Sequence, residues 1–222
     1  MAGKTWDSSD VVHLLSEERM ATYVTAADGN LDNGFELYAW NIQLATALQG
    51  ATAMVEVVVR NAIDHALTFW YQGIRPGGDW FNLPVFDERT RNDIAVARAR
   101  VRRSGSKSTH SKVLAELSFG FWRFLTSKKY LTTLWTPALY RAFPYGDKDI
   151  WTRQKQVTRL LGNMTFVRNR AAHLEPMFRR DVERDVAEAR ALMGWIDPQA
   201  LAWFNDTLKL DEVLATKPAF LK

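Results

Sequence analysis

The feature that most restricts the fold is a run of apolar residues spaced three and four positions apart, between residues 37 and 69. This spacing places apolar side chains on one face of an α-helix. The members of the pattern are Leu37, Trp40, Leu44, Leu48, Ala51, Val55, Val58, Ala62, Ala66 and Phe69. The sequence therefore predicts one long helix from just after Asp32 to about Tyr71, ended by the glycine- and proline-rich residues 73–78.

Helix start signals recur along the rest of the chain. Ser16 is an N-cap candidate for a helix from Glu17 to about Ala27, and Asp87 is one for a basic helix that ends near Arg103. Further helices are predicted over about residues 109–122, 129–143, 149–176 and 179–195 and after 197–198, with a flexible link at 104–109. No hairpin turn separates alternating runs. We therefore expect an all-α helical bundle that forms a single domain over residues 1–222.

Composition excludes several kinds of site. Cysteine is absent, so the chain has no disulfide scaffold and no thiolate metal site. Its four histidines are scattered and do not form a zinc pattern. The first seven residues have no apolar signal core, and no run approaches the length needed to span a membrane. We expect a cytoplasmic protein that uses no metal ion or other cofactor and does not bind a membrane.

Residues 166–176 combine three polar side chains near the predicted end of a long helix, which should stop close to Pro176. Asn169 and His173 are four positions apart and share a face, and Arg168 can reach the same pocket. Without a nearby carboxylate, these side chains suit a phosphate better than a metal ion, because arginine clamps phosphate oxygens and histidine transfers protons near neutral pH. An alternative is a helix C-terminus whose cations offset the macrodipole and whose histidine is a satisfied structural group.

A second copy of this arrangement lies on the long helix, where Arg60 and Asn61 precede His65. Asn61 and His65 again share a face, and Glu56 lies four residues before Arg60 and can pair with it. Two interpretations are open. The copy is either a second polar wall of the same cleft, or a salt-bridged structural arginine with a partly buried histidine.

Positive charge gathers in residues 89–112, which hold eight Lys or Arg side chains against one acid, Asp93. Such a block attracts polyanions such as nucleic acids. One alternative is a solvated helix face that runs into a loop, and another is pairing with acids of the predicted 179–195 helix. The side chains expected to follow a phosphate backbone are Arg98, Arg100, Arg102, Arg103, Lys107 and Lys112.

Five segments carry a resemblance to a known family. They are Leu15-Ser-Glu-Glu-Arg19, Leu37-Tyr-Ala-Trp-Asn41, Glu56-Val-Val-Val-Arg-Asn-Ala-Ile-Asp64, Leu117-Ser-Phe-Gly-Phe-Trp122, and Arg168-Asn-Arg-Ala-Ala-His173 with Glu175 and Pro176. In this order, and over almost the whole chain, they resemble the Abi-like (abortive infection, AbiD/AbiF type) proteins of bacteria in the HEPN superfamily. The resemblance implies a HEPN-type helical bundle with additional helices, a role in antiviral defence, a homodimer whose motifs face each other and, for some members, a small noncoding RNA partner.

For many members the resemblance implies metal-independent RNA cleavage, and Arg168, Asn169 and His173 fall on the superfamily's active motif. We therefore predict an endoribonuclease in which these three residues are catalytic. Leu174 stands where many relatives carry a second histidine, so one proton carrier is missing. The alternatives are a noncatalytic module that holds a small noncoding RNA and a structural helical adaptor. Besides the basic residues named above, the predicted RNA-binding residues are Arg60, Asn61, His65 and Arg170.

Overall fold

The computed structural model describes residues 5–105 and 107–221, and this part of the chain is built from helices without a strand. The predicted all-α class is confirmed. Two predictions reach outside the described residues. The absence of a signal core concerned residues 1–7, of which 1–4 are not described, and the flexible link at residues 104–109 includes Ser106, which is not described either.

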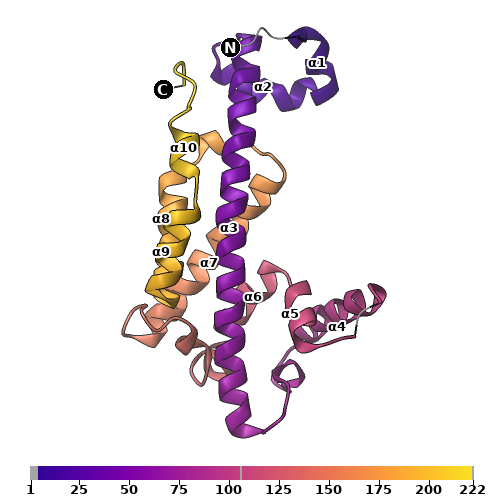
Figure 1. Cartoon of the computed structure of the whole chain (residues 1–222), viewed down its shortest axis with the longest axis vertical. Helices are drawn as coiled ribbons and strands as arrows, with labels where there is room; N and C mark the ends of the chain where they lie inside the picture. The colour runs from indigo at the N-terminus through magenta and orange to yellow at the C-terminus, as the bar shows by residue number, and fades with distance from the viewer. Residues whose placement is uncertain (1–4, 106, 222) are drawn as a thin grey trace.

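The molecule is organised around α3 (Leu31–Ile74), a single helix of 44 residues. At 1.5 Å per residue it is about 66 Å long, and it runs through the length of the molecule (Figure 1). Asn30 begins the helix, because its side chain accepts a hydrogen bond from the backbone N–H of Asn33 at 2.9 Å. The predicted apolar pattern is buried except at Val58, Ala62 and Phe69, which line a cavity described below.

By length and composition alone, α3 is long and apolar enough to cross a membrane. The prediction that no run approaches this length is therefore wrong. The inward side chains of α3, among them Leu37, Leu44 and Val55, are fully buried in the hydrophobic core. Contacts with α2 (Glu17–Ala26), α7 (Ile150–Ala172) and α8 (Val182–Ile196) cover this side of the helix. The apolar side chains on this face of α3 are therefore explained by their packing in the hydrophobic core.

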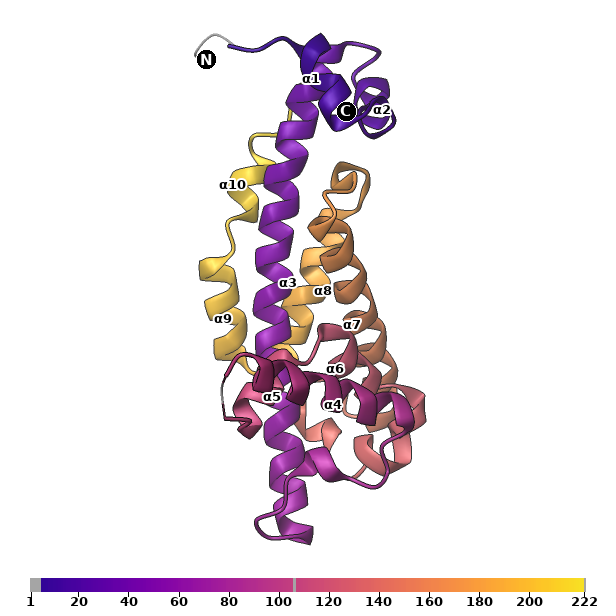
Figure 2. The ribbon, with the colours of Figure 1, turned by 90° about the vertical axis from the view of Figure 1, so that its right-hand side faces the viewer.

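α7 runs antiparallel to α3, as Figure 2 shows. Gln49 Nε2 on α3 donates to the Ala171 carbonyl at 3.0 Å, and Asn41, two turns earlier on α3, donates to the Glu175 carbonyl at 3.1 Å. α8 packs against both helices. α9 (Pro198–Thr207) and α10 (Leu210–Leu214) then lie along α3, and α1 (Ser8–Leu15) and α2 lie at its N-terminal end (Figures 1 and 2).

We call the segment from η1 (Trp80–Asn82) to α5 (His110–Glu116) the arm; it contains α4 (Glu88–Arg103). The arm lies on the other side of α3 from α8 and α9 (Figure 1). Trp80, Phe86 and Ile94 are buried and attach it to the core. Asp87 starts α4 as predicted, because its carboxylate accepts from the backbone N–H of Thr90 at 2.9 Å.

Two predictions for the segment between α5 and α7 are wrong. The helix predicted through residues 117–122 is interrupted, because Ser118 accepts from the backbone N–H of Phe121 and starts a separate helix, α6 (Phe119–Leu125). Residues 129–143 form short turns, since Pro137 cannot continue a helix. The turns are η2 (Lys128–Tyr130), η3 (Leu131–Trp135) and η4 (Leu139–Ala142).

Candidate functional site

Polar contacts from α3 hold the end of α7 in place. The helix ends at Ala172, close to the predicted stop, and Leu174 takes a φ of 51° where the chain turns. Asn41, which is fully buried, donates to the Glu175 carbonyl and accepts from the backbone N–H of Met177 at 2.7 Å. These contacts position the backbone at the helix end and leave the side chains of the motif outside the core.

Arg168, Asn169 and His173 are all exposed at this helix end. Arg168 Nη1 donates to Asn169 Oδ1 at 3.3 Å, although consecutive helix positions point about 100° apart. The two side chains therefore meet, as predicted. Among the residues that the structure describes, the His173 ring has no hydrogen bond or ion pair. The interpretation of His173 as a satisfied structural group is therefore wrong, and its imidazole is open to a ligand.

Glu56 on α3 lies close enough to Arg168 for their charges to interact. Burial raises the pKa of its carboxyl above the ordinary value, while the positive charges of Arg168 and Arg60 act in the opposite direction. The sequence indicated a pair between Glu56 and Arg60 but gave no sign of Arg168, which comes from another helix. A half-buried carboxyl beside two guanidinium groups can orient Arg168, and its raised pKa makes it easier to protonate than an exposed glutamate.

Arg170, which was predicted to bind RNA, is engaged within the chain. Its Nη1 lies 3.1 Å from Glu175 Oε2, and its guanidinium carbon lies 5.4 Å from the centre of the Phe166 ring. The residue is partly buried among its neighbours. The Arg170 guanidinium thus stabilises the turn after α7, and its charge is already paired with Glu175.

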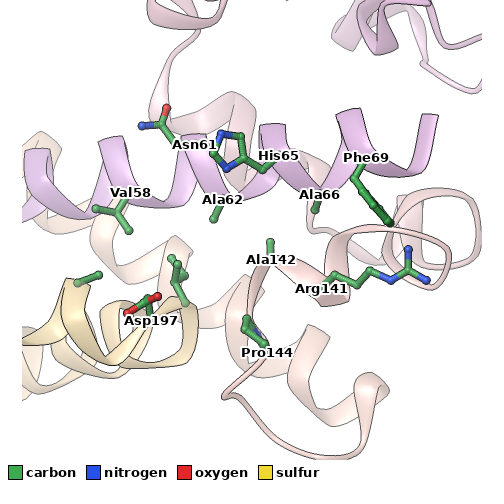
Figure 3. A pocket seen from close by; sticks show the side chains of 12 residues that line it. Val58, Asn61, Ala62, His65, Ala66, Phe69, Arg141, Ala142, Pro144 and Asp197 are labelled. Atoms are coloured by element: carbon green, nitrogen blue, oxygen red, sulfur yellow. The ribbon is translucent and has the colours of Figure 1, made fainter. Parts of the chain in front are cut away.

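The second Arg-Asn-His arrangement is split between two faces of α3. Arg60 lies near Glu56, whereas Asn61 and His65 line a separate cavity of about 500 Å³ (Figure 3). That cavity is formed with η4 and the α8–α9 junction, and none of Arg168, Asn169 and His173 lines it. The interpretation of this copy as a second wall of the same cleft is therefore wrong, because successive side chains of a helix diverge by about 100°.

The basic residues of the arm differ in their surroundings. Arg98 Nη2 donates to Asn82 Oδ1 at 3.2 Å, and the Arg98 guanidinium lies 5.8 Å from the centre of the Phe81 ring. The other five residues of this segment that were predicted to bind RNA are exposed and make no ion pair with any described residue: Arg100, Arg102, Arg103, Lys107 and Lys112. The arm therefore presents a cluster of unneutralised positive charge to solvent.

The proposed pairing of these cations with acids of α8 is wrong. The buried acids of α8 are neutralised by nearer partners. Asp185 binds Arg180 at 2.7 Å, and Glu188 binds Arg159 and Arg184. α4 and α8 lie on opposite sides of α3 (Figure 1).

A histidine–carboxylate cluster was missed by the sequence interpretation. His110 Nε2 lies 2.7 Å from Asp64 Oδ1, and His110 Nδ1 lies 3.2 Å from Asp79 Oδ1. These two hydrogen bonds raise the pKa of His110 to about 9. Burial would raise the pKa of Asp64 and of Asp79, but the hydrogen bonds that each carboxylate accepts, together with the positive charge of His110, hold both pKa values below the ordinary value. The cluster joins α3, η1 and α5, so it fixes the arm to the rest of the molecule.

Within residues 5–105 and 107–221, no group of three or more His, Asp or Glu side chains is placed to hold a metal ion. The chain has no significant match to any protein-family model, curated protein or solved structure.

Proposed function

We propose that this protein is a metal-independent endoribonuclease of the Abi-like HEPN type that acts in the cytoplasm in antiviral defence. The observation that carries the proposal is the exposed end of α7, where Arg168 reaches Asn169 and the unpaired imidazole of His173 lies one turn further on. A guanidinium, an amide and an imidazole in one exposed patch match the charge and the proton transfers that RNA cleavage requires.

In the proposed reaction the RNA provides the nucleophile. The 2′-hydroxyl attacks the adjacent phosphorus, the bond from phosphorus to the 5′-oxygen breaks, and a 2′,3′-cyclic phosphate and a 5′-hydroxyl result. His173 acts as general base or general acid. Arg168 stabilises the negative charge that develops on the phosphoryl oxygens, and Asn169 orients Arg168 or binds the phosphate. Because one histidine cannot easily both accept and donate the proton, the His173 of a second copy would complete the site in a homodimer.

The arm is the proposed RNA-binding surface. Arg100, Arg102, Arg103, Lys107 and Lys112 are exposed on this segment, which is held to α3 by the His110 cluster. Contacts of this kind bind the phosphate backbone without reading sequence, and their strength falls as salt rises. The same contacts would also bind a small noncoding RNA that the protein holds and does not cut.

Incubation of the purified protein with single-stranded RNA, and with DNA of the same sequence, tests the proposal. We expect cleavage of the RNA alone, unchanged in EDTA, with products that end in a 2′,3′-cyclic phosphate. Binding without cleavage under all conditions would favour the noncatalytic alternative, and the absence of RNA binding would favour a structural adaptor. A strict requirement for magnesium would point to another mechanism.

A further inference from the structure

Asn61 and His65 line a cavity that is open to solvent. Its volume of about 500 Å³ falls within the range of ligand pockets, which are mostly apolar with a few placed polar groups. The apolar walls come from three separate parts of the chain. They are Val58, Ala62 and Ala66 of α3, Ala142 and Pro144 of the η4 region, and Ile196 and Ala200 of the α8–α9 junction. The cavity is therefore a product of the tertiary fold.

Phe69 stands at one end of the cavity with 74% of its surface exposed. Such exposure is unusual for a large aromatic side chain, and it leaves a ring face open to stacking. The Arg141 guanidinium lies 6.0 Å from the centre of this ring, and Figure 3 shows the two side chains together. This end of the cavity therefore offers an aromatic surface and a positive charge.

Asp197 lies on the wall opposite α3, across from Ala62 (Figure 3). Its Oδ1 caps α9 by accepting from the backbone N–H of Gln199 at 2.7 Å, and its Oδ2 has no hydrogen-bond partner among the described residues. On the α3 side, Asn61 and His65 also have no side-chain hydrogen-bond partner there. Between its apolar walls, the middle of the cavity thus presents the Asp197 carboxylate as an acceptor, the Asn61 amide and the His65 imidazole.

The separation along α3 between Ala62, which faces Asp197, and Phe69, which lies beside Arg141, narrows the class of ligand (Figure 3). Ala62 and Phe69 are separated by seven positions of α3, which corresponds to about 10 Å along the helix. The α-ammonium and the α-carboxylate of an amino acid cannot span this length, because both groups are attached to one carbon. A nucleotide can span it, with the amino group of the base near Asp197, the ring against the apolar walls, and the phosphate near Arg141.

We propose that this cavity binds a nucleoside monophosphate whose base carries an exocyclic amino group. Asp197 accepts a hydrogen bond from the amino group, and Asn61 and His65 contact the edge of the base or the ribose. Arg141 binds the phosphate, and Phe69 stacks against the ligand. The proposal is independent of RNA cleavage, because none of the three predicted catalytic residues lines the cavity.

Calorimetric titration of the full chain with AMP, CMP, GMP and UMP tests the site, with the matching nucleosides and inorganic phosphate as separate ligands. We expect the three amino-bearing nucleotides to bind, and UMP to bind about tenfold more weakly, as expected for the loss of one hydrogen bond to a charged group. Inorganic phosphate alone should not compete. The His173→Ala protein should bind equally well, so a failure of the proposed ribonuclease activity would not affect this result.

Three variants locate the ligand. Arg141→Gln should weaken nucleotide binding about tenfold and leave nucleoside binding unchanged, since it removes one charged phosphate contact. Asp197→Asn keeps an N-cap residue for α9. This variant should bind AMP, CMP and GMP no more tightly than UMP. Phe69→Ala removes an exposed ring and should weaken every base-containing ligand. Arg123→Gln, at an exposed position of α6 outside the cavity, is the matched control and should have no effect.

Two outcomes would overturn the proposal. One is the absence of binding by all four nucleotides at millimolar concentration. The other is nucleotide binding whose affinity none of the three variants changes. Melting temperatures equal to that of the wild type would show that the variants are folded. If Asp197→Asn alone unfolds, Arg141→Gln and Phe69→Ala still decide the question.

Discussion

His110 Nε2 lies 2.7 Å from Asp64 Oδ1, and this contact joins the first residue of α5 to α3. The other ring nitrogen faces Asp79, and Trp80 Nε1 donates to the same Asp64 oxygen at 2.7 Å. Both ring nitrogens donate only when the imidazole carries its positive charge. The attachment of the arm to α3 therefore depends on a protonated histidine.

Stability should decrease as the pH rises through the pKa of His110. Because this pKa is raised from 6.5 to about 9, the contribution of His110 is complete below pH 6.5 and is lost as the pH rises through 9. Asp64 and Asp79 have lowered pKa values, so their contribution is lost in acid instead, as the pH falls below the ordinary value for an aspartate. Thermal unfolding of the wild type and His110→Gln between neutral pH and about pH 10 measures the effect.

At neutral pH, His110→Gln should cost about 1–3 kcal/mol, since it leaves a partly buried carboxylate without its charged donor. The difference from the wild type should narrow as the pH rises. His13→Gln is the control, because the His13 side chain is 68% exposed and should contribute about 0.5 kcal/mol or less. A pH-independent difference would contradict the role of a charged His110.

Arg168→Ala and His173→Ala should fold like the wild type and lose cleavage activity. Both side chains are exposed, and neither supports the core. Loss of a general acid or base typically reduces the rate by about 100- to 10,000-fold. Cleavage rates, toxicity at equal expression and melting temperatures check this expectation, with Lys148→Ala as an exposed control. Full activity in either variant would show that the catalytic assignment is wrong.

Replacing Arg100, Arg102 and Arg103 together with Gln should weaken RNA binding and reduce its salt dependence. For single strands the slope of log affinity against log salt changes by about 0.7 for each phosphate that is no longer neutralised. The melting temperature should stay the same, because these side chains have no partner among the described residues. Unchanged, salt-insensitive binding in the triple variant would exclude the arm as the RNA surface.

Arg98→Gln is the contrasting variant for the arm. Since Arg98 contacts Asn82 and Phe81, its replacement should lower stability by about 0.5–1 kcal/mol. Thermal unfolding of this variant beside the triple variant separates the structural arginine from the exposed ones. Equal melting temperatures for both proteins would show that the Arg98 contacts add nothing to the fold.

Activity per chain should fall on dilution if two copies form the active site. A single chain presents one His173 on an open surface, and the proposed reaction needs proton transfer at two oxygens. Light scattering and cleavage rates over the same range of protein concentration should therefore show dissociation of the dimer and loss of activity together. A monomer that keeps full activity at nanomolar concentration would contradict the composite site.

Short-range signals in the sequence determined most of the helices. The apolar spacing predicted α3 nearly to its ends, and the predicted caps Ser16 and Asp87 were correct. These features involve residues within one or two turns of each other, so the local sequence is enough to predict them. The break at Ser118 was missed because a serine within an apolar run is compatible with both a continuing helix and a new cap.

The tertiary structure alone decided which polar residues come together. Asp64 and His110 are 46 positions apart, and Asp79 and His110 are 31 apart, so no local pattern connects them. The packing of α7 against α3 brought Arg168 to Glu56 and left Asn61 and His65 in a different cavity. The sequence repeats its Arg-Asn-His arrangement, but the direction of each side chain is set by the rotation of each helix against its neighbours, and that rotation depends on packing across the whole core.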